Sequence, residues 1–381
     1  MSKICVVVHQ KQDDGLCSGL WSINDQQQII VEHSSSIYSS QQHNNTTMPV
    51  DRRAKRNDLS SALSQGDVYQ IANVLSLPPV APPTQQSSYA AGEAVKFEDH
   101  GLDWSNVLTH FCNASDAALA GHAVKSYEAT AACHSAFHTV FSTSQGNWLV
   151  PTMHAICKNT HKAALAADVE ASRAAAAASQ KADAHAYLQK AVSLLQESYS
   201  KTSNDRKEFV PDADLDEEGS KKAGVLRIVN ELFSIYFKLN TLRLCKNLLR
   251  PVESRKLHEM GSMSEMVTYK YYVGRIFLFE DQYEAAEESL NYALQHCHRS
   301  ALHNKRCILR YLVPVQLYRG RLPSAKLLEK YNLNEFLPIV EGVRTGDLKT
   351  FHDGLLQYQD LFIQYVYDMF VCVCNNACVA S

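Results

Sequence analysis

At 381 residues the chain is long enough for two or three domains with a sizeable core, and its 45% hydrophobic and 20% charged residues are ordinary for a soluble globular protein. The formal net charge of -3 points to no class of partner, and eleven scattered cysteines without a secretory signal favour free thiols over a disulfide framework. The apolar closing segment is interrupted by Asp368 and falls short of about 20 residues, so no membrane span is expected.

The N-terminal quarter of the chain divides by composition. Residues 1–50 are rich in Gln, Ser and Asn, lack an apolar period, and are predicted to be a disordered polar extension. A helix is expected from Asp51 to Leu77, and the following proline-rich stretch ends it because proline removes backbone donors. Residues 51–102 are therefore predicted to be a helix plus a linker.

Residues 103–210 have a continuous helical pattern and are predicted to form N-terminal helical repeats. Asp103 is a suitable N-cap for the first of them. The expected helices are Trp104 onward, Ala123–Phe141, Trp148 to about Ala167, and Ala184–Tyr199. The alanine run 174–178 favours helix by propensity but has no large anchor, so a mobile connection is predicted there.

An acidic loop is expected at residues 211–219, between Pro211 and Gly219. Its alternating aspartates mimic the start of a calcium-binding loop. However, Glu217 and Ala223 stand where such a loop needs glycine and a bidentate glutamate, so a solvated loop is predicted.

Residues 220–363 return to a helical pattern. The expected helices are Lys222–Leu239, Leu242–Leu249, two in the stretch 268–296, one from Asn304, Ala325–Tyr331, Phe336–Val343 and Leu348–Phe362. Pro314 lies inside the helix from Asn304, and either a kink or a break between two short helices is expected. With about a dozen helices and no convincing strand, the predicted fold is all-α, a right-handed stack of helical hairpins.

The stretch Thr268–Leu322 carries the clearest repeat signal. Small residues alternate with large ones on two helices joined by a short turn, which is the tetratricopeptide pattern. Such a hairpin needs stacked neighbours to bury its apolar face. The predicted structural repeat core consists of Gly274, Phe277, Ala286, Leu290 and Ala293.

Three segments, residues 220–254, 267–317 and 327–348, resemble the PCI-domain family of scaffold subunits from the proteasome lid, the signalosome and an initiation factor. Residues 296–314, with HCHRS, NKR and YLVP, are the most specific part. Within the family the chain most resembles the PCI subunit of transcription-export complex two, which acts at the nuclear pore. The resemblance begins near Trp104 and ends near Ile363.

This resemblance implies a non-enzymatic mRNA-export factor in the nucleus, at nuclear pores and partly in the cytoplasm. It implies two protein partners, a large scaffold subunit with its own PCI domain and a small acidic subunit of the DSS type. Family members also continue into a winged helix that binds RNA or DNA. Residues 364–381 depart from that pattern, so an aberrant tail and a truncated gene model without the winged helix are expected.

A basic cluster independently suggests a polyanion partner. Between His298 and Lys330, eight basic residues stand against Glu329 alone. Such a cluster suits phosphates or an acidic protein partner, and a plain solvated surface is the third reading. The residues predicted to bind nucleic acid or an acidic partner are Arg299, Lys305, Arg306, Arg310, Arg319 and Arg321.

Three groups of histidines and cysteines have spacings typical of metal ligands, but nothing else in the sequence supports a metal site. They are the pair His134 and His138, the trio His154, Cys157 and His161, and the tail cysteines 372, 374 and 378. The pair lacks the glutamate of a zinc-protease helix, and ordinary core or surface positions are predicted for all three groups. With no catalytic constellation, no enzyme activity, metal or cofactor is expected. The alternative function is a helical adaptor of a proteasome-lid or signalosome-like assembly that does not bind nucleic acid.

Overall fold

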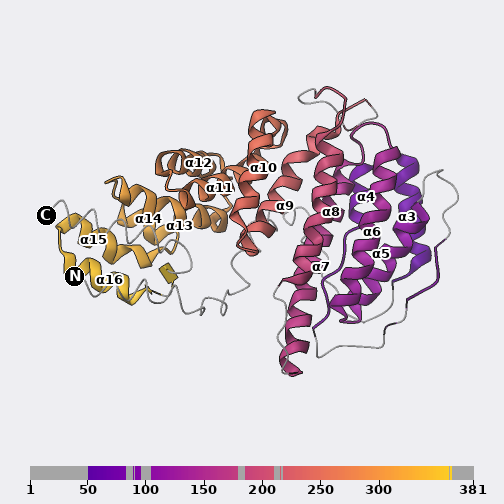
Figure 1. Cartoon of the computed structure of the whole chain (residues 1–381), viewed down its shortest axis with the longest axis horizontal. Helices are drawn as coiled ribbons and strands as arrows, with labels where there is room; N and C mark the ends of the chain where they lie inside the picture. Colours follow the sequence, from indigo (N-terminus) through magenta and orange to yellow (C-terminus); the bar gives the residue numbers. More distant parts are fainter. Residues whose placement is uncertain are drawn as a thin grey trace. The chain divides into compact units, whose positions relative to one another are not determined.

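The computed structural model describes residues 50–82, 89, 91–95, 104–178, 185–209, 215, 218–359 and 361–362. In these ranges the chain forms fourteen α-helices, three short 3-10 helices and no strand (Figure 1). The all-α prediction is therefore confirmed. The predictions for residues 1–49, for Asp103, for most of the acidic loop and for the tail lie outside the described residues.

The chain divides between Glu280 and Asp281 into two compact units. Of the described residues, 50–280 form what we call the N-terminal unit and 281–362 the C-terminal unit. This division falls inside the region 220–363 that the sequence treats as one, and the sequence-based domain boundaries stay a prediction. None of the helices in the described ranges is both long and apolar enough to cross a membrane.

In the N-terminal unit, helices that follow one another in sequence pack side by side, so that α5, α6, α7, α8 and α9 form a consecutive series and α11 packs against α9. Helix α4 also packs against α7. The bounds are α3 Arg52–Gln65, α4 Val68–Val74, α5 Trp104–Leu119, α6 Ala123–Thr143, α7 Val150–Ala177, α8 Ala186–Ser203, α9 Val225–Lys238, α10 Leu242–Ser254 and α11 Met263–Phe279, with 3-10 turns at Lys221–Gly224 and Leu257–Met260.

The single helix predicted from Asp51 to Leu77 is wrong, because the structure has two. Gly66 takes a left-handed conformation with φ of 66° and ends α3, and the Asp67 side chain then accepts a hydrogen bond from the backbone of Gln70 to start α4. A glycine at the C-terminal cap of one helix, followed directly by an aspartate that caps the next, marks the boundary between two helices. The spacing of apolar residues continues across this boundary and does not reveal it.

The connection predicted at the alanine run is also wrong. Helix α7 continues to Ala177 and is the long helix of Figure 1. The last turns are largely exposed. Alanine has the highest intrinsic helix propensity, and no glycine or proline interrupts the run, so the helix extends even where few side chains anchor it.

The C-terminal unit contains α12 Tyr283–His296, α13 Leu302–Tyr318, α14 Ala325–Lys330, α15 Leu337–Thr345 and α16 Leu348–Gln357, with a 3-10 turn at Asn334–Phe336. Helix α12 packs against α13, and α15 against α16. Helix α13 runs unbroken through Pro314, so the expectation of two short helices is wrong. Pro314 and its neighbours from Cys307 to Val315 are buried, and this packing compensates for the missing backbone donor.

Gly342 allows α15 and α16 to approach closely. A Cβ atom at this position would lie 2.7 Å from the backbone nitrogen of Phe351, and a backbone atom cannot rotate away. We expect Gly342→Ala to lower the free energy of unfolding of the C-terminal unit by about 2 kcal/mol through overpacking. Urea unfolding followed by circular dichroism measures this loss. Lys349→Ala, at an exposed position of α16, is the control and should change stability by less than about 0.5 kcal/mol. Equal effects of the two substitutions would contradict the close packing.

Candidate interaction surface

The six predicted binding residues do not form one patch. Helices α12 and α13 are joined by a short loop and run antiparallel, so Arg299, Lys305 and Arg306 lie at one end of the pair and Arg319 and Arg321 at the other. The rise of an α-helix places Lys305 and Arg319 about 20 Å apart along α13. A single phosphate or carboxylate therefore cannot contact both groups.

Arg310, the sixth residue, is not on the surface. It is only 8% exposed, and the residues on either side of it, Leu309 and Tyr311, are buried as well. The prediction of an exposed binding role for Arg310 is inconsistent with this position. The sequence placed Arg310 on one face with Arg306 by helical spacing, but α13 is buried around its whole circumference in this part, so spacing alone does not identify an outer face.

At the far end of the pair, the two arginines are held by acids from α12. Arg319 Nη1 lies 2.9 Å from Glu287 Oε2 and Arg321 Nη1 lies 2.7 Å from Glu287 Oε1, and Glu287 is 4% exposed in its side chain. Arg319 also contacts Glu284 at 3.3 Å. These acids precede the segment over which the sequence counted charge, so the positive excess at this end is largely cancelled.

The remaining cations, Arg299, Lys305 and Arg306, are at the end of α12–α13 that contains the connecting loop. Arg299 is exposed, and Lys305 and Arg306 are partly exposed. We call these three residues the loop-end cations. In the described part of the chain none of them forms an ion pair, so their charge is available to an anionic partner. The basic region that the sequence predicted is thus reduced to half its members.

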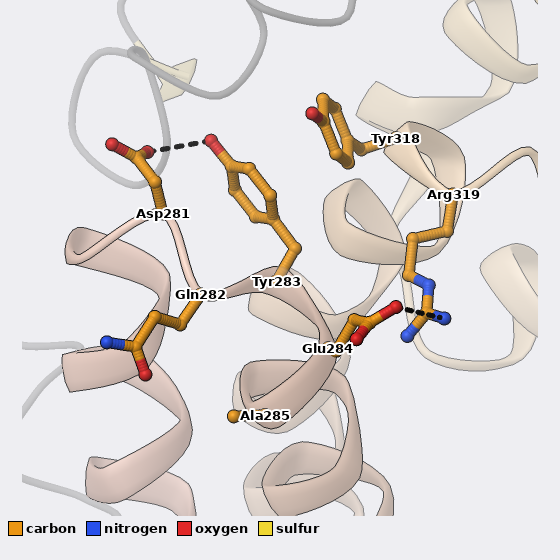
Figure 2. A pocket seen from close by; sticks show the side chains of 7 residues that line it. All are labelled: Asp281, Gln282, Tyr283, Glu284, Ala285, Tyr318 and Arg319. Carbon is orange, nitrogen blue, oxygen red and sulfur yellow. Dashed lines mark hydrogen bonds and ion pairs between the residues drawn. The ribbon is translucent and has the colours of Figure 1, made fainter.

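A hollow lies at the opposite end of the pair, between the start of α12 and the end of α13. Figure 2 shows its lining, with Asp281 on one side of the Tyr283 ring and Tyr318 and Arg319 on the other. The Tyr283 hydroxyl donates a hydrogen bond of 2.8 Å to Asp281, and the two tyrosine rings have centroids 4.3 Å apart. Aromatic rings and carboxylates thus share one hollow. Nothing in the sequence indicated this hollow, because its lining comes from two different helices.

Of the predicted repeat core, four members are buried: Gly274, Ala286, Leu290 and Ala293, while Phe277 is partly exposed. The two helices predicted as a hairpin exist, with a turn at residues 280–282, but the boundary between the two units falls within that turn. Within its own unit α12 packs against α13, and α11 packs against α9 and α10 in the other.

The two histidines and one cysteine of α7 that have metal-like spacing do not converge, and the histidines have different partners. His154 Nε2 lies 2.9 Å from the Gly224 carbonyl, and His161 Nδ1 lies 2.6 Å from Glu231 Oε2. Among the described residues no group of three or more acidic, histidine or cysteine side chains converges on a metal position. Burial raises the pKa of the Cys157 thiol to about 12, so this cysteine is held as a neutral thiol.

His134 and His138 lie on a buried polar relay that links α6, α7 and α8. His134 Nδ1 is 2.8 Å from Thr160 Oγ1, both histidine Nε2 atoms are 2.8 Å from Ser198 Oγ, and His138 Nδ1 is 3.2 Å from Glu197 Oε2. The two hydroxyls also donate to backbone carbonyls, Thr160 Oγ1 to Ile156 at 2.9 Å and Ser198 Oγ to Leu194 at 3.1 Å. The spacing HSAFH indicated the two neighbours on α6, but nothing in the sequence indicated the serine between them.

The relay has the geometry of a serine–histidine–glutamate group without a place for a substrate. Ser198 and His134 are fully buried and His138 is 3% exposed, and Ser198 is shared between two histidines instead of being directed at a cavity. Burial lowers the pKa of His134 well below its usual value and that of His138 as well, with Glu197 opposing the shift at His138. These features make the relay a part of the core that keeps two imidazoles neutral.

The described residues form two units of packed α-helices, with polar side chains at both ends of the α12–α13 pair and histidines buried in the core. No family model matches the chain. It is 40% identical over 177 residues to PCI domain-containing protein 2 of Danio rerio, covering 46% of this chain and 43% of that protein. It is 28% identical over 320 residues to enhanced ethylene response protein 5 of Arabidopsis thaliana, covering 81% and 72%. It is 34% identical over 233 residues to protein CSN12 homolog of Mycosarcoma maydis, covering 58% and 50%.

These similarities confirm the resemblance to the PCI-domain family. The chain is a helical protein similar to PCI domain-containing protein 2. The matched region spans about half the length of the PCI domain-containing relatives.

Proposed function

We propose that this chain is a non-enzymatic scaffold subunit of a nuclear-pore-associated mRNA export complex. It binds a large scaffold partner that has its own PCI domain and a small acidic subunit. The observation that carries the proposal is the similarity to PCI domain-containing protein 2, together with the family segments at residues 220–254, 267–317 and 327–348. The buried histidines form hydrogen bonds with other core residues, which supports a structural role for their side chains.

An affinity purification of the full chain from nuclear extract tests this proposal. A large PCI-containing scaffold and a small acidic subunit at equal stoichiometry would support the export role, as would imaging at nuclear pores. The alternative is a helical adaptor of a proteasome-lid or signalosome-like assembly, which the printed name of the Mycosarcoma relative, protein CSN12 homolog, also fits. Recovery of lid or signalosome subunits, without an export scaffold, would favour that alternative and contradict the export role.

RNA or DNA contact is assigned to the loop-end cations, because Arg319 and Arg321 are engaged by Glu287 and Arg310 is buried. Replacing all three loop-end cations with glutamine is expected to weaken binding of single-stranded RNA and to reduce the slope of log affinity against log salt by about 2, since each phosphate contact contributes roughly 0.7. Fluorescence anisotropy over a salt series measures this slope.

Arg321→Gln is the matched control. Arg321 is 61% exposed, and its loss leaves Glu287 paired with Arg319, so the salt slope should stay unchanged. If Arg321→Gln lowers the salt slope equally, the loop-end cations are not the specific site of RNA contact. A wild-type chain with no salt-dependent RNA binding would remove nucleic acid from the proposed function and leave the protein partners.

A further inference from the structure

The hollow at the start of α12 has a charge that its neighbours do not cancel. Asp281, Glu284 and Glu287 carry three negative charges against the two positive charges of Arg319 and Arg321. Both arginines are held by Glu287, the buried acid, at 2.9 and 2.7 Å. Among the described residues, the one ion pair of Glu284, whose side chain is 87% exposed, is the longer contact of 3.3 Å to Arg319. A cation from a partner can therefore pair with Glu284 while Arg319 keeps its shorter ion pair with Glu287.

The aromatic part of the hollow is fixed in position. Asp281 has a left-handed backbone with φ of 58°, a conformation that aspartate tolerates better than most residues. From this position its carboxylate accepts a hydrogen bond from the Tyr283 hydroxyl. The Tyr283 ring lies against the ring of Tyr318 from α13 (Figure 2). The two rings form one aromatic wall with a carboxylate on each side.

We propose that this hollow binds the guanidinium group of an arginine presented by an exposed segment of a partner protein. A planar guanidinium stacks on a tyrosine face and donates to a carboxylate at the same time, so it matches both parts of the lining. A phosphate is excluded from this end of the pair by the net negative charge, in contrast to the loop-end cations. Such a site has a role only in a protein that meets other proteins, so it rests on the proposed scaffold function.

The test uses the full chain with isotopically labelled tyrosine rings and a short probe, acetyl-Gly-Arg-Gly-amide. Saturable shifts of the Tyr283 and Tyr318 ring signals are expected with this peptide, and no such shifts with the citrulline peptide, which has the same shape without the charge. Tyr318→Phe assigns one of the two ring signals. Because the probe is a free peptide, failure of this titration is distinct from failure of the purification that tests the scaffold role.

Glu284→Gln is expected to weaken the arginine peptide about threefold, the scale of an exposed ion pair. Glu288→Gln is the matched control, since Glu288 is also exposed, lies one turn further along α12 and does not line the hollow. Unchanged binding in Glu288→Gln supports the site. Equal weakening by both variants, equal shifts with the citrulline peptide, the absence of saturable shifts, or binding of a phosphorylated probe at the same rings would each overturn it.

Discussion

Lowering the pH from 7 to 5 is expected to reduce the free energy of unfolding of the N-terminal unit by about 2 kcal/mol through His154 alone, with His134 acting in the same direction. Burial lowers the pKa of His154 to about 3, with Arg227 adding to the shift, and lowers the pKa of His134 well below its usual value. An unfolded histidine has a pKa near 6.5. Between that value and the folded pKa the unfolded chain binds protons that the native state excludes, so stability falls as pH falls. At pH 5 His154 costs about 2 kcal/mol, and His134 adds to the loss.

Urea unfolding at pH 7, 6 and 5, followed by tryptophan fluorescence, measures this loss. Trp104 and Trp148 both lie in the N-terminal unit and therefore report on its unfolding. Asparagine does not titrate, so His154→Asn should shrink the loss between pH 7 and 5 by about 2 kcal/mol, even if the variant is less stable at pH 7. His110→Asn, at a partly exposed position of α5, should leave the loss unchanged. An unfolding free energy that is the same at pH 7 and pH 5 would contradict neutral burial of these histidines.

Much of the helical architecture is readable from the sequence, and what could not be read has identifiable causes. The all-α class follows from the helical spacing of the apolar residues and from the scarcity of strand patterns. The α3–α4 break was missed because a glycine stop and an aspartate start adjoin at Gly66 and Asp67 within one apolar period. The alanine run lacks a large anchor, which predicts a connection, but its high helix propensity extends α7 through it.

The candidate surface was less predictable than the fold because it depends on side chains from different helices. Counting charge along the chain identifies Arg319 and Arg321 but not Glu287, which reaches them from the preceding helix. Helical spacing puts Arg310 beside Arg306 but does not show that α13 is covered on that side. In the same way, spacing brings His134 to His138 on α6, whereas Ser198 joins them from sixty residues away. A single sequence has no signal for such pairings.

The buried pair His161–Glu231 is expected to give the largest effect of a single substitution, with Glu231→Ala lowering the free energy of unfolding by about 3 kcal/mol. The His161 and Glu231 side chains are 10% and 6% exposed, and their contact of 2.6 Å joins α7 to α9. Burial alone would raise the pKa of Glu231, but the hydrogen bond with His161 and the nearby charges, including those of Lys158 and Arg227, together lower it. Removing the carboxylate leaves a buried imidazole without its partner, and that desolvated group accounts for most of the cost.

A double-mutant cycle separates this pair from simple loss of packing. Glu231→Gln keeps an acceptor oxygen for His161 and should cost about 1.5 kcal/mol. Glu128→Ala, at an exposed position of α6, is the control and should stay within about 0.5 kcal/mol of the wild type. In the double variant His161→Ala, Glu231→Ala the losses should be less than additive, by about 1 to 3 kcal/mol. Strict additivity would mean that the two side chains stabilise α7 and α9 independently, and the contact would then add nothing beyond the burial of each.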